Sequence, residues 1–235
     1  MSKHLKDGFT LAELLIIAPI VILVVTSIVS AMVVLTGNVL VSRASNKLLY
    51  GLHDTLARID QDVSSSKSVL KESIDPTRPQ GLNNDTTKFS TTDNKTLILN
   101  SYTTSTNLIN KDKNIIFDDS NDSVMFNTVY FLDLNKTLWR RVIAPNSYED
   151  YDTWQLPSCA DEQTEAICKV KDTKLLDKID TMTIEYKDAD GDEIAIDTCT
   201  DDDPIKMTIS ITATASIAGR EVSQSASLEL DTICN

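Results

Sequence analysis

The sequence predicts an α+β protein, in which a long N-terminal α-helix packs on a head formed by an antiparallel β-sheet. Residues 9–35 are apolar apart from one charged residue, Glu13, and apolar residues then recur at helical spacing. From residue 96 onward, segments rich in β-branched residues alternate with turn-forming residues. The chain therefore divides into a leader (1–8), a transmembrane or assembly helix (9–36), an amphipathic continuation of that helix (37–69) and a β-rich head (70–235).

The apolar run is long enough to cross a membrane. About 20 apolar residues span the hydrocarbon core of a bilayer, and residues 9–35 exceed that length. A secretory signal peptide would have a shorter apolar run of roughly 7–15 residues. We therefore expect one membrane-spanning helix, in which Pro19 and Gly37 are the positions where a bend is expected.

Beyond the span, apolar residues continue at the three-and-four spacing of one helical face. They are Val39, Leu40, Leu48, Leu49, Leu52, Leu56, Ile59 and Val63. This pattern predicts one unbroken helix to about Val63, roughly 80 Å long at 1.5 Å per residue, whose second half buries its apolar stripe against the head. His53 on this segment is interpreted as a surface or packing residue.

The remaining chain predicts a loop followed by strands. Serine, proline, asparagine and glycine are abundant between residues 64 and 95, which predicts a loop. The predicted strands are 96–102, 114–117, 123–132, 137–143, 178–186, 193–196, 205–217 and 220–230. Segments 124–133 and 137–144 predict an antiparallel hairpin, and so do the last two strands, which turn at Ala218 and Gly219.

The charge is strongly negative, at −13 for the whole chain. An acidic surface keeps an exported domain soluble and repels nucleic acid phosphates unless basic residues cluster locally. The sequence shows no such cluster. We therefore expect no direct nucleic acid binding.

All four cysteines lie in the C-terminal third, and an even number in a domain carried across a membrane favours disulfides. Four cysteines permit three pairings. The most local one joins Cys159 to Cys168 and leaves Cys199 with Cys234, which ties the chain end back to the head. A zinc site is the alternative, but no CxxC or HxxxH spacing is present.

The N-terminal residues carry a specific motif. The polar leader MSKHLKDG ends in Gly8, directly before Phe9 and the apolar run, and Glu13 follows four positions after Phe9. This arrangement resembles the N-terminal signal of type IV prepilins and pseudopilins. The order of a long helix and then antiparallel strands is similar to the same family, and the segments LWRR and IEYKDADGDEI resemble its larger minor subunits more than a compact major pilin.

The resemblance implies that a membrane-embedded prepilin peptidase cuts between Gly8 and Phe9 and methylates the new amine of Phe9. Glu13 would then lie one helical turn from that amine, in an apolar setting where an unpaired carboxylate costs several kcal/mol. The resemblance implies that its partner is the N-terminal amine of an adjacent subunit, so that the pair sets the assembly register. The alternative is a carboxylate near the membrane interface that meets water or the dipole of its own helix.

The segment YKDADGDEI places Asp188, Asp190 and Asp192 at alternate positions, as at the start of a calcium loop. The twelfth loop position is Cys199 rather than glutamate, so a full EF-hand is rejected. Asp201, Asp202 and Asp203 could add oxygens to a structural calcium site. The favoured interpretation is an Asp-Gly hairpin turn with a solvated acidic tip and no cofactor.

These features predict a structural subunit, a minor pilin or pseudopilin, of a type IV pilus-like filament. The implied partners are the prepilin peptidase, other pilin or pseudopilin subunits, a membrane assembly platform and, before assembly, the lipid bilayer. The subunit would span the inner membrane once with its head outside the cytoplasm, and then enter an extracellular or periplasmic filament. No nucleophile arrangement or phosphate-binding loop predicts an enzyme. The alternative is a single-pass membrane-anchored receptor or adhesin that uses the span as a tether.

Overall fold

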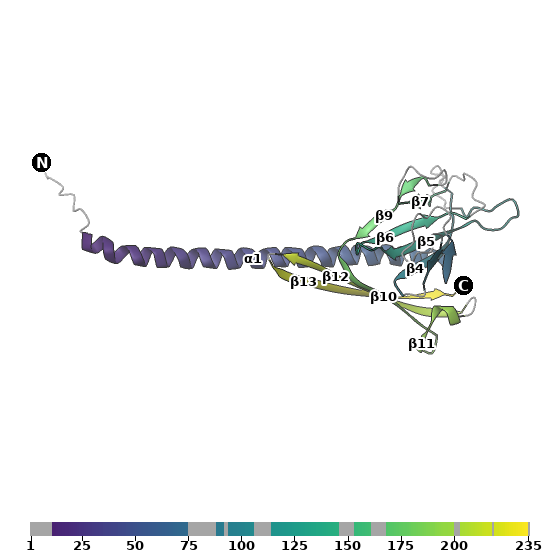
Figure 1. Ribbon diagram of the computed structural model, residues 1–235. Helices are drawn as coiled ribbons and strands as arrows, with labels where there is room; N and C mark the ends of the chain where they lie inside the picture. The colour runs from purple at the N-terminus through teal and green to yellow at the C-terminus, as the bar shows by residue number, and fades with distance from the viewer. Residues whose placement is uncertain are drawn as a thin grey trace.

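One α-helix, α1 (Leu11–Ser64), forms a stalk whose C-terminal half is built into a β-rich head (Figure 1). The computed structural model describes residues 11–74, 88–91, 94–105, 114–145, 153–160, 168–199, 203–217 and 219–234. The fold class is the predicted one, a long helix packed against antiparallel β-sheets. The helix runs without interruption through Pro19 and Gly37, so neither residue breaks it.

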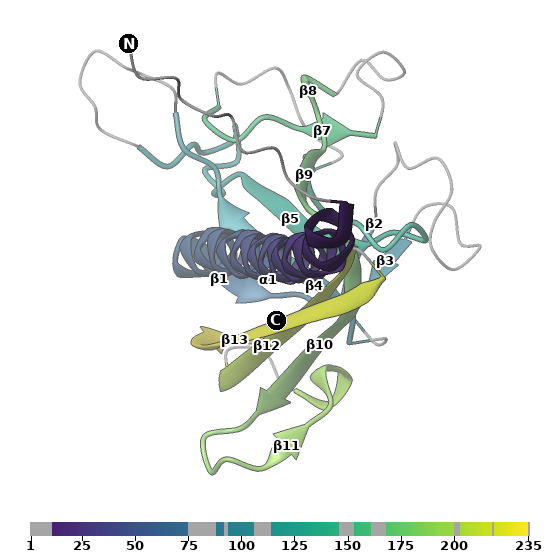
Figure 2. The ribbon, with the colours of Figure 1, turned by 90° about the vertical axis from the view of Figure 1, so that its left-hand side faces the viewer.

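Two antiparallel sheets make up most of the head. The five-stranded sheet has the order β1-β4-β5-β6-β9, with β1 (Ser66–Val69), β4 (Thr96–Tyr102), β5 (Met125–Leu132), β6 (Leu138–Ile143) and β9 (Thr173–Leu176). The four-stranded sheet has the order β11-β10-β12-β13, with β10 (Ile179–Lys187), β11 (Glu193–Ile194), β12 (Pro204–Ile217) and β13 (Arg220–Ile233). Figure 2 shows α1 lying between the strands of these two sheets.

Three smaller elements complete the described head. β2 (Glu72–Ile74) pairs antiparallel with β3 (Lys88–Ser90), and β7 (Ser158–Cys159) pairs parallel with β8 (Val170–Lys171). A 3₁₀ turn, η1 (Ile196–Thr198), follows β11. A parallel bridge between Val69 and Cys234 joins the edge of the five-stranded sheet to the end of β13.

The main core lies between the helix and the two sheets. The predicted apolar stripe of α1 supplies five buried residues, Leu48, Leu52, Leu56, Ile59 and Val63. They pack against the inward side chains of both sheets, which alternate along β12 between buried and more accessible positions. Full burial of one such aliphatic side chain contributes roughly 1.5–3 kcal/mol. The stripe therefore fixes the stalk rigidly in the head.

The central strands of the five-stranded sheet are buried on both faces. Its outer face carries a second apolar cluster of Phe89, Ile98, Val129 and Ile143. β2, β3, β7 and β8 belong to segments that cover this side of the sheet, and Phe89 lies on β3. In β4, Ile98, which faces away from the helix, is therefore as buried as Leu97 and Leu99, which face it.

Several predicted boundaries are wrong. The helix ends at Ser64, close to the predicted Val63, but the segment assigned to its continuation reached 69, and residues Ser66–Val69 of it instead pair with β4 as strand β1. The predicted loop between 64 and 95 is wrong where β1, β2 and β3 form. These short polar strands show no alternation of apolar residues, and they form because they pair with neighbouring strands. Segment 114–117 makes only isolated bridges, and 193–196 divides into β11 and η1.

The other predicted strands are confirmed to within a few residues, including both hairpins. β5 pairs with β6, and β12 pairs with β13 along their full 14-residue lengths. The predictions missed β7, β8 and β9, whose two to four residues carry no distinct alternation. The long hairpin extends back along the stalk, beyond the rest of the head (Figure 1).

Candidate membrane and assembly helix

The N-terminal half of α1 is apolar and uncovered on every side. Every large apolar residue between Leu11 and Leu35 is exposed; Leu23 is 68% and Leu35 is 65% accessible. A helix that packs on a soluble core exposes only one polar face, whereas a helix that is apolar all round is normally covered by lipid or by other helices. This is the one helix in the described chain that is long and apolar enough to cross a membrane.

Polar side chains in this apolar half satisfy their hydrogen bonds within the helix. The hydroxyls of Thr26 and Ser27 donate to the carbonyl oxygens of Ile22 and Leu23 at 2.8 and 2.7 Å, and Thr36 donates to the carbonyl of Met32 at 2.8 Å. Bonding to the carbonyl four residues earlier leaves no hydroxyl hydrogen to be solvated by water. Such internal bonding suits a hydrocarbon environment, where each unsatisfied polar group costs several kcal/mol.

Of the predicted processing residues, Gly8 and Phe9 lie outside the described residues. Glu13 lies in the first turn of α1 as defined here, and its side chain is exposed. From Glu13 to Arg43 the helix carries no other charged residue. The carboxylate therefore marks one end of a long uncharged cylinder.

At the other end of the helix, a hydrogen-bonded charge pair, here called the latch, joins α1 to the five-stranded sheet, and no local sequence pattern predicted it. Asp62 lies in the last turn of α1, where the helix dipole disfavours negative charge. Its Oδ2 accepts hydrogen bonds from Arg140 Nε and from the Tyr130 hydroxyl, both at 2.5 Å. Arg140 and Tyr130 are register partners on β6 and β5, so the sheet presents both donors together.

This latch perturbs the ionisation of both donors. Burial and then the nearby Asp62 carboxylate raise the pKa of Tyr130 well above its ordinary value. Burial alone lowers the pKa of Arg140, but the hydrogen bond and charge of Asp62 outweigh it and raise the pKa. Tyr130 therefore stays a neutral donor and Arg140 a cation.

The adjacent Arg141 points to the opposite face of the sheet, because side chains alternate along a strand. It pairs with Asp172 at 2.6 Å, both side chains being almost fully buried, and Asp172 also accepts a bond from Ser158 at 2.9 Å. The Arg141 guanidinium lies 5.9 and 5.6 Å from the ring centres of Phe89 and Phe131. The pair of arginines in LWRR thus ties β6 to the helix on one side and to the β7–β8 segment on the other.

Two disulfides have the most local pairing considered from the sequence. Cys159 is bonded to Cys168 and Cys199 to Cys234, with Cα–Cα distances of 5.7 and 6.2 Å. Both distances lie in the ordinary range for disulfides. The second bond holds the end of β13 against the turn η1, and Lys71 Nζ adds a 3.0 Å hydrogen bond to the Cys199 carbonyl oxygen.

The acidic segment at 188–192 forms a hairpin turn between β10 and β11. Asp188 Oδ1 accepts the backbone N–H groups of Asp190 at 3.0 Å and Asp192 at 2.9 Å, and Gly191 has a φ of 92°. Only glycine adopts that φ without strain. The Asp188 carboxylate therefore organises the turn, as the favoured interpretation expected.

The same turn recurs twice where no alternating aspartates exist. Asp118 Oδ1 accepts from Ser120 and Asp122 N–H, and Asp133 Oδ1 accepts from Asn135 and Thr137 N–H. The fourth residue of each turn, Asn121 or Lys136, also has a positive φ. Asp188 thus has the same role in its turn as Asp118 and Asp133 have in theirs.

The calcium site expected as an alternative receives no further support from the described residues. Within them, no group of three histidine, cysteine or acidic residues is arranged to hold a metal ion. Asp201 and Asp202, which were expected to add oxygens to Asp188, Asp190 and Asp192, lie outside the described residues.

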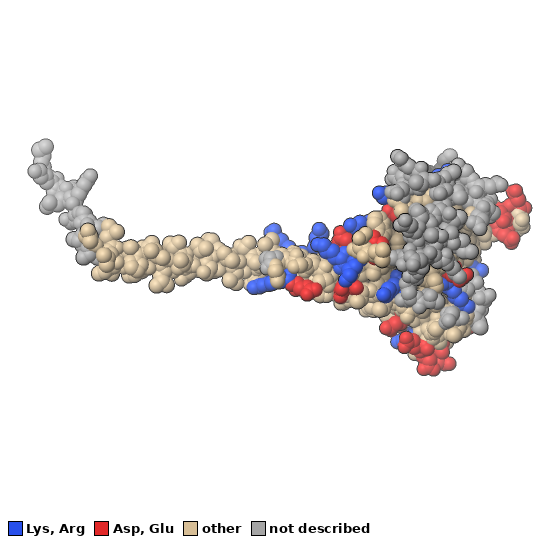
Figure 3. Space-filling model, in the orientation of Figure 1, with Lys and Arg blue, Asp and Glu red and all other residues tan. Residues whose placement is uncertain are grey.

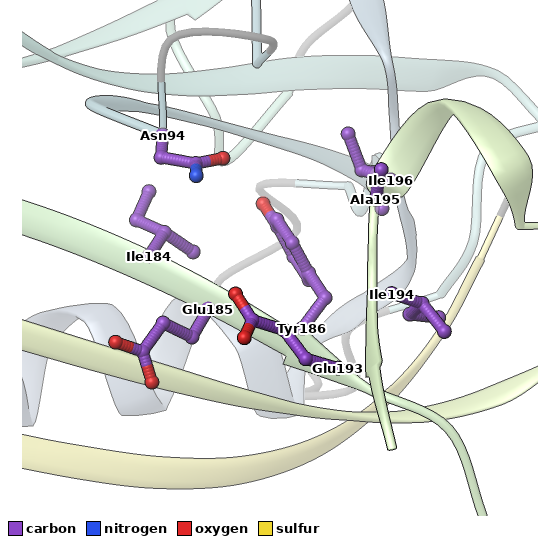
Figure 4. Close-up of a pocket in the computed structure, with 8 residues that line it drawn as sticks. All are labelled: Asn94, Ile184, Glu185, Tyr186, Glu193, Ile194, Ala195 and Ile196. Carbon is purple, nitrogen blue, oxygen red and sulfur yellow. The ribbon is translucent and has the colours of Figure 1, made fainter.

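A cavity of about 400 Å³ opens between β10, β11 and the turn at Asn94 (Figure 4). Its described lining is Asn94, Ile184, Glu185, Tyr186, Glu193, Ile194, Ala195 and Ile196. These residues include two carboxylates but no serine, cysteine, histidine or lysine.

Comparison with known protein families, with curated proteins and with solved structures found no match.

Proposed function

We propose that this protein is a structural subunit, a minor pilin or pseudopilin, of a type IV pilus-like filament, and that it is processed by a prepilin peptidase and assembled through α1. One observation carries the proposal. The same continuous helix is built into the head over its second half and is apolar and exposed all round over its first half. A bilayer covers this surface before assembly, and the helices of neighbouring subunits cover it in the filament.

The rigid attachment of the helix supports assembly more than simple tethering. The apolar stripe and the latch from Asp62 to Arg140 and Tyr130 fix the stalk direction relative to the head. A flexible tether requires no such attachment. A filament subunit does, because the position of each helix in the central bundle must determine where its head lies on the surface.

The leader and Glu13 supply the processing and register steps of the proposal. Cleavage between Gly8 and Phe9 creates a cationic amine near the start of the helix. In a bundle of apolar helices, the Glu13 carboxylate is attracted to the amine of a neighbouring subunit over a low-dielectric path. A misplaced subunit lacks that attraction, so the pair favours one axial register.

The two disulfides support a location outside the cytoplasm. Structural disulfides persist in oxidising compartments such as the periplasm and the cell exterior. The proposal therefore places the head beyond the inner membrane before assembly. Its role is structural rather than catalytic, and energy for assembly comes from a separate machine acting through a membrane platform.

N-terminal analysis of the protein purified from its own cells tests processing. The proposal expects a mature chain that begins with an N-methylated Phe9. A mature chain that retains its leader would refute the assignment and leave a membrane-anchored ectodomain, receptor or adhesin, as the better description.

A charge-removing variant tests assembly separately. Glu13→Ala should be processed normally but recovered poorly in sheared filaments. Thr26→Ala is the matched control, because Thr26 lies in the same apolar half but bonds only within its own helix. Equal filament yield from both variants would contradict the register role and favour the tether.

A further inference from the structure

Basic residues from two distant parts of the chain lie at the same level of α1, where the apolar stalk enters the head. Arg43 and Lys47 are exposed, and their four-residue spacing places them on one face of α1. Arg220 begins β13 at the tip of the long hairpin, and its Nη1 lies 3.3 Å from the Asn38 side-chain oxygen of the helix. These three cations are called the basic collar below. Figure 3 shows blue side chains where the tan stalk widens into the head.

The collar has cations on two opposite sides of the helix. The hairpin lies along the side of α1 that carries Asn38 and Ser45, which bond to Arg220 and Gln224. Arg43 lies two residues before Ser45, which at 100° per residue is close to the opposite side. Positive charge is therefore presented around the axis of the stalk.

The collar stands out against an acidic molecule. The whole chain has 22 basic and 35 acidic residues, yet no acidic residue lies in α1 between Glu13 and Asp54. Glu221, next to Arg220 at the hairpin tip, is the nearest acid in sequence to the collar cations, and the four residues together carry a charge of about +2 at neutral pH. The net charge of these four residues is thus opposite in sign to that of the whole protein.

The collar lies one bilayer thickness from Glu13. The 30 residue steps from Glu13 to Arg43 correspond to about 45 Å of helix at 1.5 Å per residue. A bilayer measures roughly 40–45 Å when its headgroup layers are included. With Glu13 at one surface, Arg43 reaches the headgroups of the other, because helical side chains point back toward the N-terminus.

We propose that the basic collar of Arg43, Lys47 and Arg220 binds the phosphates of anionic lipids on the head side of the membrane, and so docks the β12–β13 hairpin tip on the bilayer before assembly. This inference rests on the membrane-anchored state of the proposed function. It adds that the head is oriented by the lipid surface, since contacts around the stalk restrict its tilt. Extraction into a filament must then break these contacts.

The test uses the full chain in nanodiscs of zwitterionic phosphatidylcholine and in nanodiscs that also contain anionic phosphatidylglycerol. Amide hydrogen exchange is measured for the peptide that covers the hairpin tip. We expect exchange at least about three-fold slower in the anionic discs, because each basic residue near an anionic surface adds attraction. The difference should shrink at high salt, which screens exposed charges.

Two variants separate lipid binding from hairpin packing. Arg43→Gln with Lys47→Gln leaves the Arg220 contact to Asn38 intact and should lose most of the lipid dependence. Lys206→Gln is the matched control, because Lys206 is a similarly exposed cation on β12, 11 residues or about 36 Å from Ile217, which pairs with Arg220 at the hairpin tip. It should keep the dependence in full.

The outcomes distinguish the two proposals. A chain that fails to insert into either disc would refute the membrane-anchored state and the collar together. A chain that inserts, but whose hairpin tip exchanges equally in both discs or equally in all variants, would overturn the collar alone.

Discussion

Removing one partner of the Arg141–Asp172 pair should destabilise the head far more than removing both. The two side chains are only 4% and 3% exposed, so a charge left behind loses its main counter-charge at a site that water hardly reaches. Breaking a buried pair in this way costs roughly 3–5 kcal/mol, a large share of the 5–15 kcal/mol that typically stabilises a folded protein. We expect that loss for Arg141→Met and for Asp172→Leu.

The double variant should recover much of this loss. With both charges gone, the site between Phe89 and Phe131 becomes apolar, and replacing a buried pair by hydrophobic residues is often close to neutral. The remaining cost is the acceptor lost by Ser158, about 1 kcal/mol. The coupling energy between the two sites should therefore amount to several kcal/mol.

Urea unfolding of the detergent-solubilised full chain, with its disulfides intact and followed by tryptophan fluorescence, measures these free energies. The Lys136–Asp180 pair is the control: its side chains are 61% and 52% exposed, and its removal should cost no more than about 1 kcal/mol. Single variants at the buried site that cost as little as this control would refute the reasoning. So would a double variant whose loss equals the sum of the two singles.

Three further results are expected from the same assay. The folded-state pKa of Tyr130 is raised, so its contribution to the free energy of unfolding is complete below about pH 10 and is lost as the pH rises further. Tyr130→Phe should reduce this loss of stability at high pH. An unchanged dependence of stability on pH in the variant would contradict the expectation. Leu52→Ala should cost about 2–5 kcal/mol, whereas Leu23→Ala in the exposed half should leave head stability unchanged. Replacing Cys199 and Cys234 by serine should lower the free energy of unfolding by about 4 kcal/mol, because the disulfide closes a loop with a sequence separation of 35 residues. A loss below about 1 kcal/mol would show that tethering the chain end contributes little to stability.

The long helix was predictable because its signals are local. An uncharged run of membrane length and a stripe from Leu48 to Val63 at three-and-four spacing need no knowledge of the partner surface. Long strands such as β5 and β12 were predictable for the same reason, since their alternation and β-branched residues are local. The short strands β1, β2, β7 and β8 were not, because their polar residues become strand only by pairing with a neighbour.

The charged contacts of the head required the fold. LWRR was noted as a motif, but its residues give no indication that Arg140 reaches Asp62, 78 positions away, while Arg141 reaches Asp172, 31 positions away. The alternation of a strand predicts opposite faces for adjacent arginines, and only the placement of α1 and β7 supplies their partners. In the same way, the sequence predicted a turn at 188–192, and only the structure shows that the same carboxylate-centred turn recurs at Asp118 and Asp133.

By itself, the sequence determined that a helix of membrane length continues into an amphipathic stem and a β-rich head, because charge, apolar period and turn residues are encoded between near neighbours. The tertiary structure alone decided which charges meet. No cluster of basic residues exists along the chain, yet the hairpin returns Arg220 to the helix beside Asn38, 182 positions earlier. Contacts over such separations depend on the register and length of paired strands, which a linear pattern of charges does not contain.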